Sequence, residues 1–166
     1  IIIGAHMDHA GESSGRGYTC TQKGAGDVIC NGADDNGSGT ISVLNIAKSL
    51  AAVRTNLKRS VIIMWFSGEE EGLIGSYYYV KNPIIPLEKT KYMINMDMVG
   101  YAKSYNSTLD AIGGDKHPHA KKVIEEIRAK YPNIRVKFTN QVGGGSDHEP
   151  FFDKKIPGVF WHTGVS

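Results

Sequence analysis

The sequence predicts a single α/β domain whose mainly parallel, mixed central β-sheet is flanked by helices on both faces. Short apolar runs typical of strands alternate along the chain with segments that have the spacing of amphipathic helices. A chain of 166 residues can bury a sizeable core. Since no repeat, low-complexity tract or linker divides it, we expect one domain over residues 1–166.

The first half of the chain carries two predicted strands and two predicted helices. The isoleucine-rich residues 1–5 predict a buried strand, and the glycine-rich residues 9–33 predict a long surface loop of a kind that is often functional. Apolar residues from Thr40 to Val53 recur at helical spacing, which predicts a helix. The continuous apolar run 60–66 is typical of a strand buried on both faces, and a helix is expected over about residues 72–79.

The second half continues the alternation. Residues 91–96 predict a strand, and residues 110–113 predict a shorter one. The apolar period from His119 to Tyr131 predicts an amphipathic helix that a proline ends. Residues 134–138 and 158–161 predict the last two strands.

The composition excludes several classes of partner. The hydrophobic share of 40% and the charged share of 22% are those of an ordinary globular protein. A net charge of +2 without a basic run argues against nucleic acid and anionic membrane surfaces. No apolar stretch approaches the ~20 residues of a membrane span. Because the chain opens inside an apparent core strand, we expect the natural N-terminus and any targeting segment to lie outside it.

Cys20 and Cys30 are the only cysteines, and both lie in the long glycine-rich loop. Two free thiols and a loop disulfide of an exported protein are both compatible with this pair. A cysteine-based metal site is disfavoured, because the spacing is not that of a zinc knuckle and no second pair exists.

Five potential metal ligands stand where strand-like runs give way to glycine-, serine- or aspartate-rich loops. The carboxyl ends of strands in an open α/β sheet are where ligands and catalytic groups collect. Two imidazoles and three carboxylates gathered there form the donor set of a hydrolytic, zinc-type site. The five residues are His6, Asp34, Glu70, Asp97 and His148.

The N-terminal histidines have different surroundings. A single histidine after a strand is more often a polar residue that is hydrogen-bonded within the protein than a metal ligand. Asp8 follows His6 by two positions, however, and its carboxylate can hold the second ring nitrogen of a metal-bound histidine. His9 has no such companion, so its expected role is that of a solvated loop histidine.

The acidic clusters also allow two interpretations each. Asp34 and Asp35 can cap the helix that follows, and one of them can also bridge metals at its N-terminus. Glu69, Glu70 and Glu71 can form a solvated charged run. They directly follow an apolar strand, however, and neighbouring side chains there point in different directions. One glutamate can therefore bind a metal while the next takes a proton from water.

The last two candidates lie in contrasting settings. Asp97 is an acid among apolar neighbours, so burial requires a partner for its charge, and a metal is a natural one. His148 follows the glycine triplet 143–145, for which a structural turn is the alternative. The triplet lacks the spacing of a dinucleotide fingerprint, so we expect no nucleotide cofactor.

Five motifs, in this order, resemble those of the bacterial co-catalytic (dizinc) leucyl-type aminopeptidases, within the zinc exopeptidase family. That family also contains glutamate carboxypeptidases, glutaminyl cyclases and receptor-like members without activity. The resemblance implies a zinc-exopeptidase-like fold and two zinc ions per chain. The motifs are GAHMD from residue 4, NGADDNGSG from residue 31, FSGEEEGLIGS from residue 66, INMDMVG from residue 94 and GGSDHEPF ending at residue 151.

The resemblance also implies a role for each ligand. His6 and Asp97 would hold one zinc ion, and Glu70 and His148 the other. Asp34 would bridge the two ions.

The resemblance also bears on four further residues. Asp8 would orient His6, and Asp35 would follow Asp34 through a cis peptide bond. Glu69 would act as general base toward a water that bridges the two zinc ions. Glu71 occupies a position that varies in the family.

The expected function is therefore hydrolysis of N-terminal residues from peptides, with a peptide as the partner. One rival is a single-zinc glutaminyl cyclase-like acyltransferase, although residues 34–39 resemble the peptidase form of their motif. The other is an inactive, receptor-like protein-binding domain, although such members typically lose ligands that are present here. Side-chain specificity, amino- versus carboxypeptidase action, the natural metal and the oligomeric state stay open.

The chain is shorter than the domain it resembles. Family members carry extra elements before the first strand, and an Asp-Tyr-His segment and a closing helix after a strand like residues 158–164. We therefore expect a zinc exopeptidase catalytic domain truncated at both ends. The resemblance alone favours a secreted or periplasmic protein.

Overall fold

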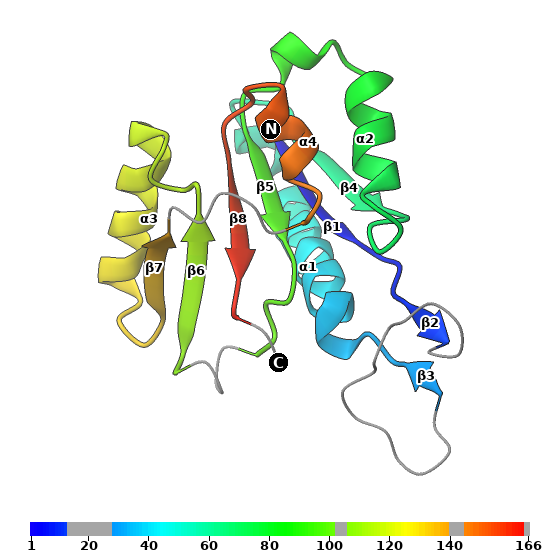
Figure 1. The fold of residues 1–166 in the computed structure, drawn as a ribbon. Coiled ribbons are helices and arrows are strands. Elements are labelled where there is room, and N and C mark those ends of the chain that lie inside the picture. The colour runs from blue at the N-terminus through cyan, green and yellow to red at the C-terminus, as the bar shows by residue number, and fades with distance from the viewer. Residues whose placement is uncertain (13–27, 102–105, 140–144, 165–166) are drawn as a thin grey trace.

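The computed structural model describes residues 1–12, 28–101, 106–139 and 145–164, and a six-stranded sheet lies at its centre (Figure 1). The strand order is β4-β1-β5-β8-β6-β7. All neighbouring strands run parallel except β6 and β8, which are antiparallel. This confirms the predicted mainly parallel, mixed sheet. The strands are β1 (Ile2–His6), β4 (Ile62–Phe66), β5 (Met93–Met96), β6 (Thr108–Ile112), β7 (Arg135–Thr139) and β8 (Gly158–His162).

In the described part of the chain, four helices pack on the sheet, and three short helical turns connect elements. Each predicted helix and strand is present within about two residues of its predicted bounds. The five-residue helix α4 was not predicted, because so short a segment carries no helical period. The helices are α1 (Gly39–Ala52), α2 (Ile74–Lys81), α3 (Pro118–Lys130) and α4 (Glu149–Asp153), and the turns are η1 (Ala33–Ser38), η2 (Arg54–Asn56) and η3 (Leu87–Lys89).

The central strand β1 has helices on both of its faces. Since successive side chains of a strand point to opposite faces, Ile2 and Ile3 enter different clusters. Ile2 packs with Tyr79 of α2 and Phe151 of α4, whereas Ile3 packs with Val43 of α1. Full burial of a side chain such as Ile2 contributes about 1.5–3 kcal/mol. The isoleucine run of β1 is thus explained by burial on both sides.

The helix α3 lies on the same face of the sheet as α1. Its buried residue Ile124 packs with Val136 of β7 and Val159 of β8. Ile94 of β5 contacts both this cluster and the one beneath α1, so the two clusters are continuous. Helices α2 and α4 contact each other on the opposite face. Both faces of the sheet are therefore covered, as predicted.

The strand β4 differs from its prediction, because it forms an edge of the sheet. Its apolar side chains do point to both faces: Phe66 enters the cluster beneath α2, and Ile63 enters the one beneath α1. As an edge strand it is only half-buried, and Trp65 remains 36% exposed. The expectation of complete burial was wrong, since an apolar run does not tell a central strand from an edge strand.

The long loop after β1 contains a small antiparallel pair of strands, β2 (Gly11–Glu12) and β3 (Ile29–Cys30). Cys30 is buried and disulfide-bonded, whereas Cys20 lies outside the described residues. Within the residues that the structure describes, no helix is long and apolar enough to cross a membrane.

Candidate metal centre

The carboxyl ends of β1, β4 and β5 bring most of the predicted site residues together. These strands are parallel neighbours, and His6 at the end of β1 pairs with Phe66 at the end of β4. Glu69 and Glu70 follow β4 directly, and Asp97 follows β5. The predicted convergence at one edge of the sheet is therefore observed.

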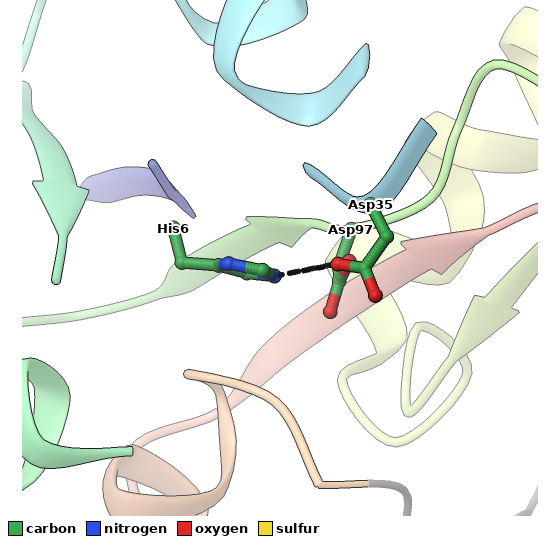
Figure 2. Close-up of side chains that lie close together, drawn as sticks. All are labelled: His6, Asp35 and Asp97. Carbon is green, nitrogen blue, oxygen red and sulfur yellow. Dashed lines mark ion pairs between the residues drawn. The ribbon is translucent and has the colours of Figure 1, made fainter. Parts of the chain in front are cut away.

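His6, Asp35 and Asp97 form the first group of potential metal ligands (Figure 2). The Nε2 atom of His6 lies 3.3 Å from Oδ1 of Asp35 and 3.3 Å from Oδ1 of Asp97. Two donor atoms about 2.1 Å from a tetrahedral zinc ion lie roughly 3.4 Å apart. The observed spacing therefore fits three ligands of one ion.

The imidazole of His6 is oriented for this role. Its Nδ1 atom donates a hydrogen bond to the backbone carbonyl of Asp8 at 3.1 Å, since a carbonyl can only accept. The Nε2 atom faces the carboxylates, and in the neutral ring it carries the lone pair that a metal ion would bind. His6 is only 1% exposed, and neither its Nε2 nor Oδ1 of Asp97 has a hydrogen-bond partner among the described residues. Such atoms fit a bound cation.

The charge on His6 supports the same conclusion. Burial alone lowers the pKa of His6, but the facing carboxylates of Asp35 and Asp97 outweigh it and raise the pKa to about 11. A proton on the His6 ring thus supplies the positive charge that a metal ion would supply at the same position.

A second group consists of His9, Asp35 and Glu70. The Nδ1 atom of His9 lies 2.7 Å from Oε1 of Glu70 and 3.9 Å from Oδ2 of Asp35. Burial raises the pKa of Glu70, and repulsion from Asp35 adds to this shift, whereas His9 opposes it. Asp35 belongs to both groups and turns a different oxygen toward each histidine.

The structure places Asp34 elsewhere. Its Oδ1 atom accepts a hydrogen bond from the backbone N–H of Gly100 at 2.8 Å, and its carbonyl accepts one from Ser38 Oγ at 2.7 Å. The shared position predicted for Asp34 is occupied by Asp35. The cis peptide joins Asp35 to Asn36, so the predicted cis bond between Asp34 and Asp35 was wrong by one residue.

Among the described residues, neither group of potential ligands includes His148. Its ring stacks on Phe160 with centroids 4.4 Å apart and meets Phe152 edge-on. Burial lowers the pKa of His148 to about 4, although the charge of Asp97 opposes this. The predicted pairing of His148 with Glu70 as ligands of one ion is therefore not found among the described residues.

Asp8 contacts His6 chiefly through its backbone. Its carboxylate Oδ1 lies 3.8 Å from Nδ1 of His6, beyond hydrogen-bond distance, while its carbonyl accepts the bond described above. The predicted orientation of His6 by the Asp8 carboxylate is thus supplied mainly by the carbonyl.

Glu69 lies beside the first group without belonging to it. Its Oε2 atom is 4.0 Å from Nε2 of His6. Burial raises the pKa of Glu69 to about 8, with the charge of His6 opposing this and the carboxylate of Asp97 adding to it. Glu71, by contrast, is exposed. The position of Glu69 suits proton transfer next to the ligands.

A buried chain of hydrogen bonds holds Asp97. Ser146 Oγ donates to Oδ2 of Asp97 at 2.8 Å, and Asn95 Nδ2 donates to Ser146 Oγ at 2.8 Å. His162 Nδ1 donates to the Asp97 carbonyl at 2.9 Å. The sequence pattern did not indicate a role for Ser146 or Asn95, although both lie within the five motifs.

The start of α1 is tied to the same strand ends. Thr40 Oγ1 donates to the carbonyl of His6 at 2.7 Å, and Asn36 Nδ2 donates to the carbonyl of Met96 at 3.0 Å. A Cβ atom at Gly39 would overlap Asn36 Oδ1 and the carbonyl of Met96. The glycine therefore allows the close approach that positions the turn carrying Asp35.

Similarity to known proteins extends over nearly the whole chain. The sequence matches Peptidase family M28 over residues 1–164. It is 30% identical over 165 residues to a probable leucine aminopeptidase of Trichophyton verrucosum, covering 96% of this chain but only 41% of that protein.

Two solved structures share the fold. BSAP, a zinc aminopeptidase from Bacillus subtilis, is 26% identical with a TM-score of 0.70, covering 97% of this chain and 36% of that one. A glutaminyl cyclase of Porphyromonas gingivalis is 24% identical with a TM-score of 0.64, covering 96% and 57% respectively, and this likeness shows the fold alone.

Proposed function

This chain belongs to peptidase family M28, and we propose that the protein is a zinc-dependent aminopeptidase that releases N-terminal residues from peptides. The chain spans about two-fifths of the curated relative it matches, which is named a probable leucine aminopeptidase. The activity is therefore proposed for the whole protein.

The shared position of Asp35 is the observation that carries the proposal. One oxygen of its carboxylate faces His6, and the other faces His9. A carboxylate placed between two groups of ligands is what a pair of metal ions requires, and paired metals are typical of aminopeptidases. A receptor-like protein has no need of this arrangement, and a single-zinc acyltransferase needs only one group.

The residues present can hold the metal. His6, Asp35 and Asp97 would bind one ion, and Asp35 and Glu70 would contribute to a second. When bound, zinc supplies Lewis acidity toward a peptide carbonyl and toward water.

Glu69 is proposed as the general base. It would accept a proton from the attacking water and return it to the leaving amine. Its position beside His6, outside both groups, leaves its carboxylate available for this transfer. Water attacks the peptide carbon, the C–N bond breaks, and the new amine leaves with the proton that Glu69 held.

The test is an assay of the full-length protein on peptides with free and with blocked N-termini, beside elemental analysis for zinc. We expect hydrolysis of free N-termini only, lost on chelation and restored by zinc. Cyclisation of N-terminal glutamine without hydrolysis would support the acyltransferase instead. Zinc binding without turnover of any substrate would support the receptor-like alternative, and release of C-terminal residues would indicate a carboxypeptidase.

We further propose that the protein works outside the reducing cytoplasm. Cys30 is disulfide-bonded, and disulfides persist mainly in exported proteins. Fractionation of the source cells with an antibody against the protein would test this, and an exclusively cytoplasmic signal would contradict it.

A further inference from the structure

We infer that His162, the last residue of β8, binds the α-ammonium group of the substrate through its Nε2 atom. This inference rests on the proposed aminopeptidase function and adds a substrate-binding residue to it. His162 lies outside the five sequence motifs, so the sequence pattern gives it no role.

His162 lies at the same edge of the sheet as the groups of potential ligands, on the next strand. β8 pairs with β5 in parallel, and Met96 pairs with Trp161, so Asp97 and His162 come next on the two strands. The backbone N–H of Asp97 donates to the carbonyl of Trp161 at 3.2 Å, so the pairing continues to this point. Figure 1 shows β4, β1, β5 and β8 as neighbours with their carboxyl ends at one edge.

Two contacts hold the imidazole of His162. Its Nδ1 atom donates a hydrogen bond to the carbonyl of Asp97 at 2.9 Å, and its ring lies against Phe160 with centroids 5.4 Å apart. Because a carbonyl can only accept, the proton is on Nδ1, and in the neutral ring Nε2 carries a lone pair. His162 is half-buried, and its Nε2 atom has no hydrogen-bond partner among the described residues. The side chain therefore presents a fixed, available acceptor.

The order of the strands determines which part of a substrate meets this acceptor. Glu69 follows β4, His6 ends β1, Asp97 follows β5 and His162 ends β8, and these four strands are consecutive in the sheet. Glu69 is proposed to return a proton to the leaving amine, so the leaving amine lies toward β4. The residue on the other side of the scissile bond then extends toward β8 and His162.

The α-ammonium group is the donor that every such N-terminal residue carries. Its nitrogen is two covalent bonds, about 2.5 Å, from the scissile carbonyl carbon, so it stays close to the reacting group. The carboxylate of Asp97 is already engaged, since Oδ2 accepts from Ser146 and Oδ1 faces His6. Nε2 of His162 is an acceptor that remains available on this side.

A purely structural role would explain only half of this arrangement. Support for the Asp97 carbonyl requires one donor, which Nδ1 supplies. It assigns no task to Nε2. Two substitutions separate the two nitrogen atoms: an asparagine amide can replace the Nδ1 donor but not the Nε2 acceptor, whereas the longer glutamine amide can place an oxygen near the position of Nε2.

Calorimetry of the zinc-loaded full-length protein tests the inference with leucine and 4-methylpentanoic acid, which differ only in the α-amino group. The ratio of their dissociation constants measures how strongly that group is recognised. His162→Asn should reduce this preference for leucine by at least about tenfold, the effect of losing a hydrogen bond to a charged group. His162→Gln should retain most of the preference. The matched control is His119→Asn, because His119 is an exposed histidine on α3.

Kinetics and NMR provide independent readouts. His162→Asn should raise KM for peptides and leave kcat nearly unchanged, since the α-ammonium contact exists before and during reaction. In the unmodified protein, the Nε2 signal of His162 should shift when leucine is added but not when 4-methylpentanoic acid is added. The NMR measurement does not depend on the folding of any variant.

The outcomes separate this inference from the proposed function. An unchanged preference in His162→Asn, or an unmoved Nε2 signal at saturating leucine, would overturn the role of His162 and leave the aminopeptidase proposal standing. A preference that falls in His162→Gln but not in His162→Asn would also overturn it, because His162 would then act only through Asp97. Failure of the wild-type protein to hydrolyse any peptide would remove the proposed function and this inference with it.

Discussion

Ser146 donates a hydrogen bond to Asp97 across 49 positions of sequence and thereby determines which carboxylate oxygen faces His6. The Oδ2 atom of Asp97 is occupied by the serine, and Oδ1 lies 3.3 Å from Nε2 of His6. Ser146 is itself 1% exposed and receives a hydrogen bond from Asn95. The three side chains form a connected support for one ligand.

Ser146→Ala should therefore weaken zinc binding by ~10–100-fold, the usual effect of losing a group that orients a ligand. The dissociation constant of the tighter ion is the quantity to measure. Ser49→Ala is the matched control, since the exposed Ser49 donates a hydrogen bond to the carbonyl of Asn45 within α1. Equal affinities in the two variants would show that Asp97 needs no support from Ser146.

Glu69→Gln should abolish peptide hydrolysis while leaving the zinc content nearly unchanged. Glu69 lies outside both groups of ligands, so its loss removes the proton acceptor and no donor atom. Glu70→Gln should instead release one ion. Elemental analysis and initial rates, measured on both variants, check the division of roles. An equal fall in zinc content would contradict it.

Asp35→Asn and Asp34→Asn form a second matched pair. Asp35 faces both histidines, so its substitution should lower the affinity for each zinc ion. The expected loss is at least about tenfold, the lower limit for losing a group that only orients a ligand. Asp34 accepts from Gly100 at 2.8 Å, and an amide oxygen can accept the same bond. Its substitution should change affinity less than tenfold. The reverse order of effects would return the bridging role to Asp34.

Asp8→Asn should have a small effect, below about tenfold on zinc affinity, compared with ~10–100-fold for a carboxylate that orients a ligand. The bond to His6 comes from the backbone carbonyl of Asp8, which the substitution retains. A larger loss would mean that the carboxylate, at 3.8 Å in this structure, approaches His6 when metal is bound.

Removal of zinc should lower the melting temperature. An ion that binds only the folded chain stabilises it by about 2.7 kcal/mol when its free concentration is 100 times its dissociation constant. Without an ion, the carboxylates of Asp35 and Asp97 converge on a buried histidine with only a proton to balance their charge. The change in melting temperature is measured by thermal unfolding in the presence of a chelator and again after zinc is restored. An unchanged melting temperature would argue against resident metal.

The position of the site could be predicted from sequence, but not which of several nearby residues belongs to it. Apolar runs ending in polar residues identify the carboxyl ends of parallel strands, and so located His6, Glu70 and Asp97. Asp34 and Asp35 differ only in the direction of their side chains. That direction depends on the irregular backbone of the turn, where Asp35 has φ −101° and ψ 96°.

The histidines show the same limit. His9 lies in a loop without periodicity, so the sequence gives no sign that its ring turns back toward Glu70. His148 has a motif-like setting, but its ring stacks on Phe160 of β8, a contact between elements that the sequence pattern does not show. Tertiary packing determines the position of both histidine rings, and a local sequence pattern carries no information about that packing.

Because one carboxylate belongs to both groups, the two ions would not bind independently. The first ion to bind would restrict rotation of the Asp35 side chain. The second ion would then bind at a lower cost in conformational entropy. The linkage is reciprocal. If one bound ion raises the affinity for the other by some factor, the other raises the affinity for the first by the same factor. Uptake of metal at this centre would then be cooperative, and half-loaded protein would be scarce at intermediate zinc concentrations.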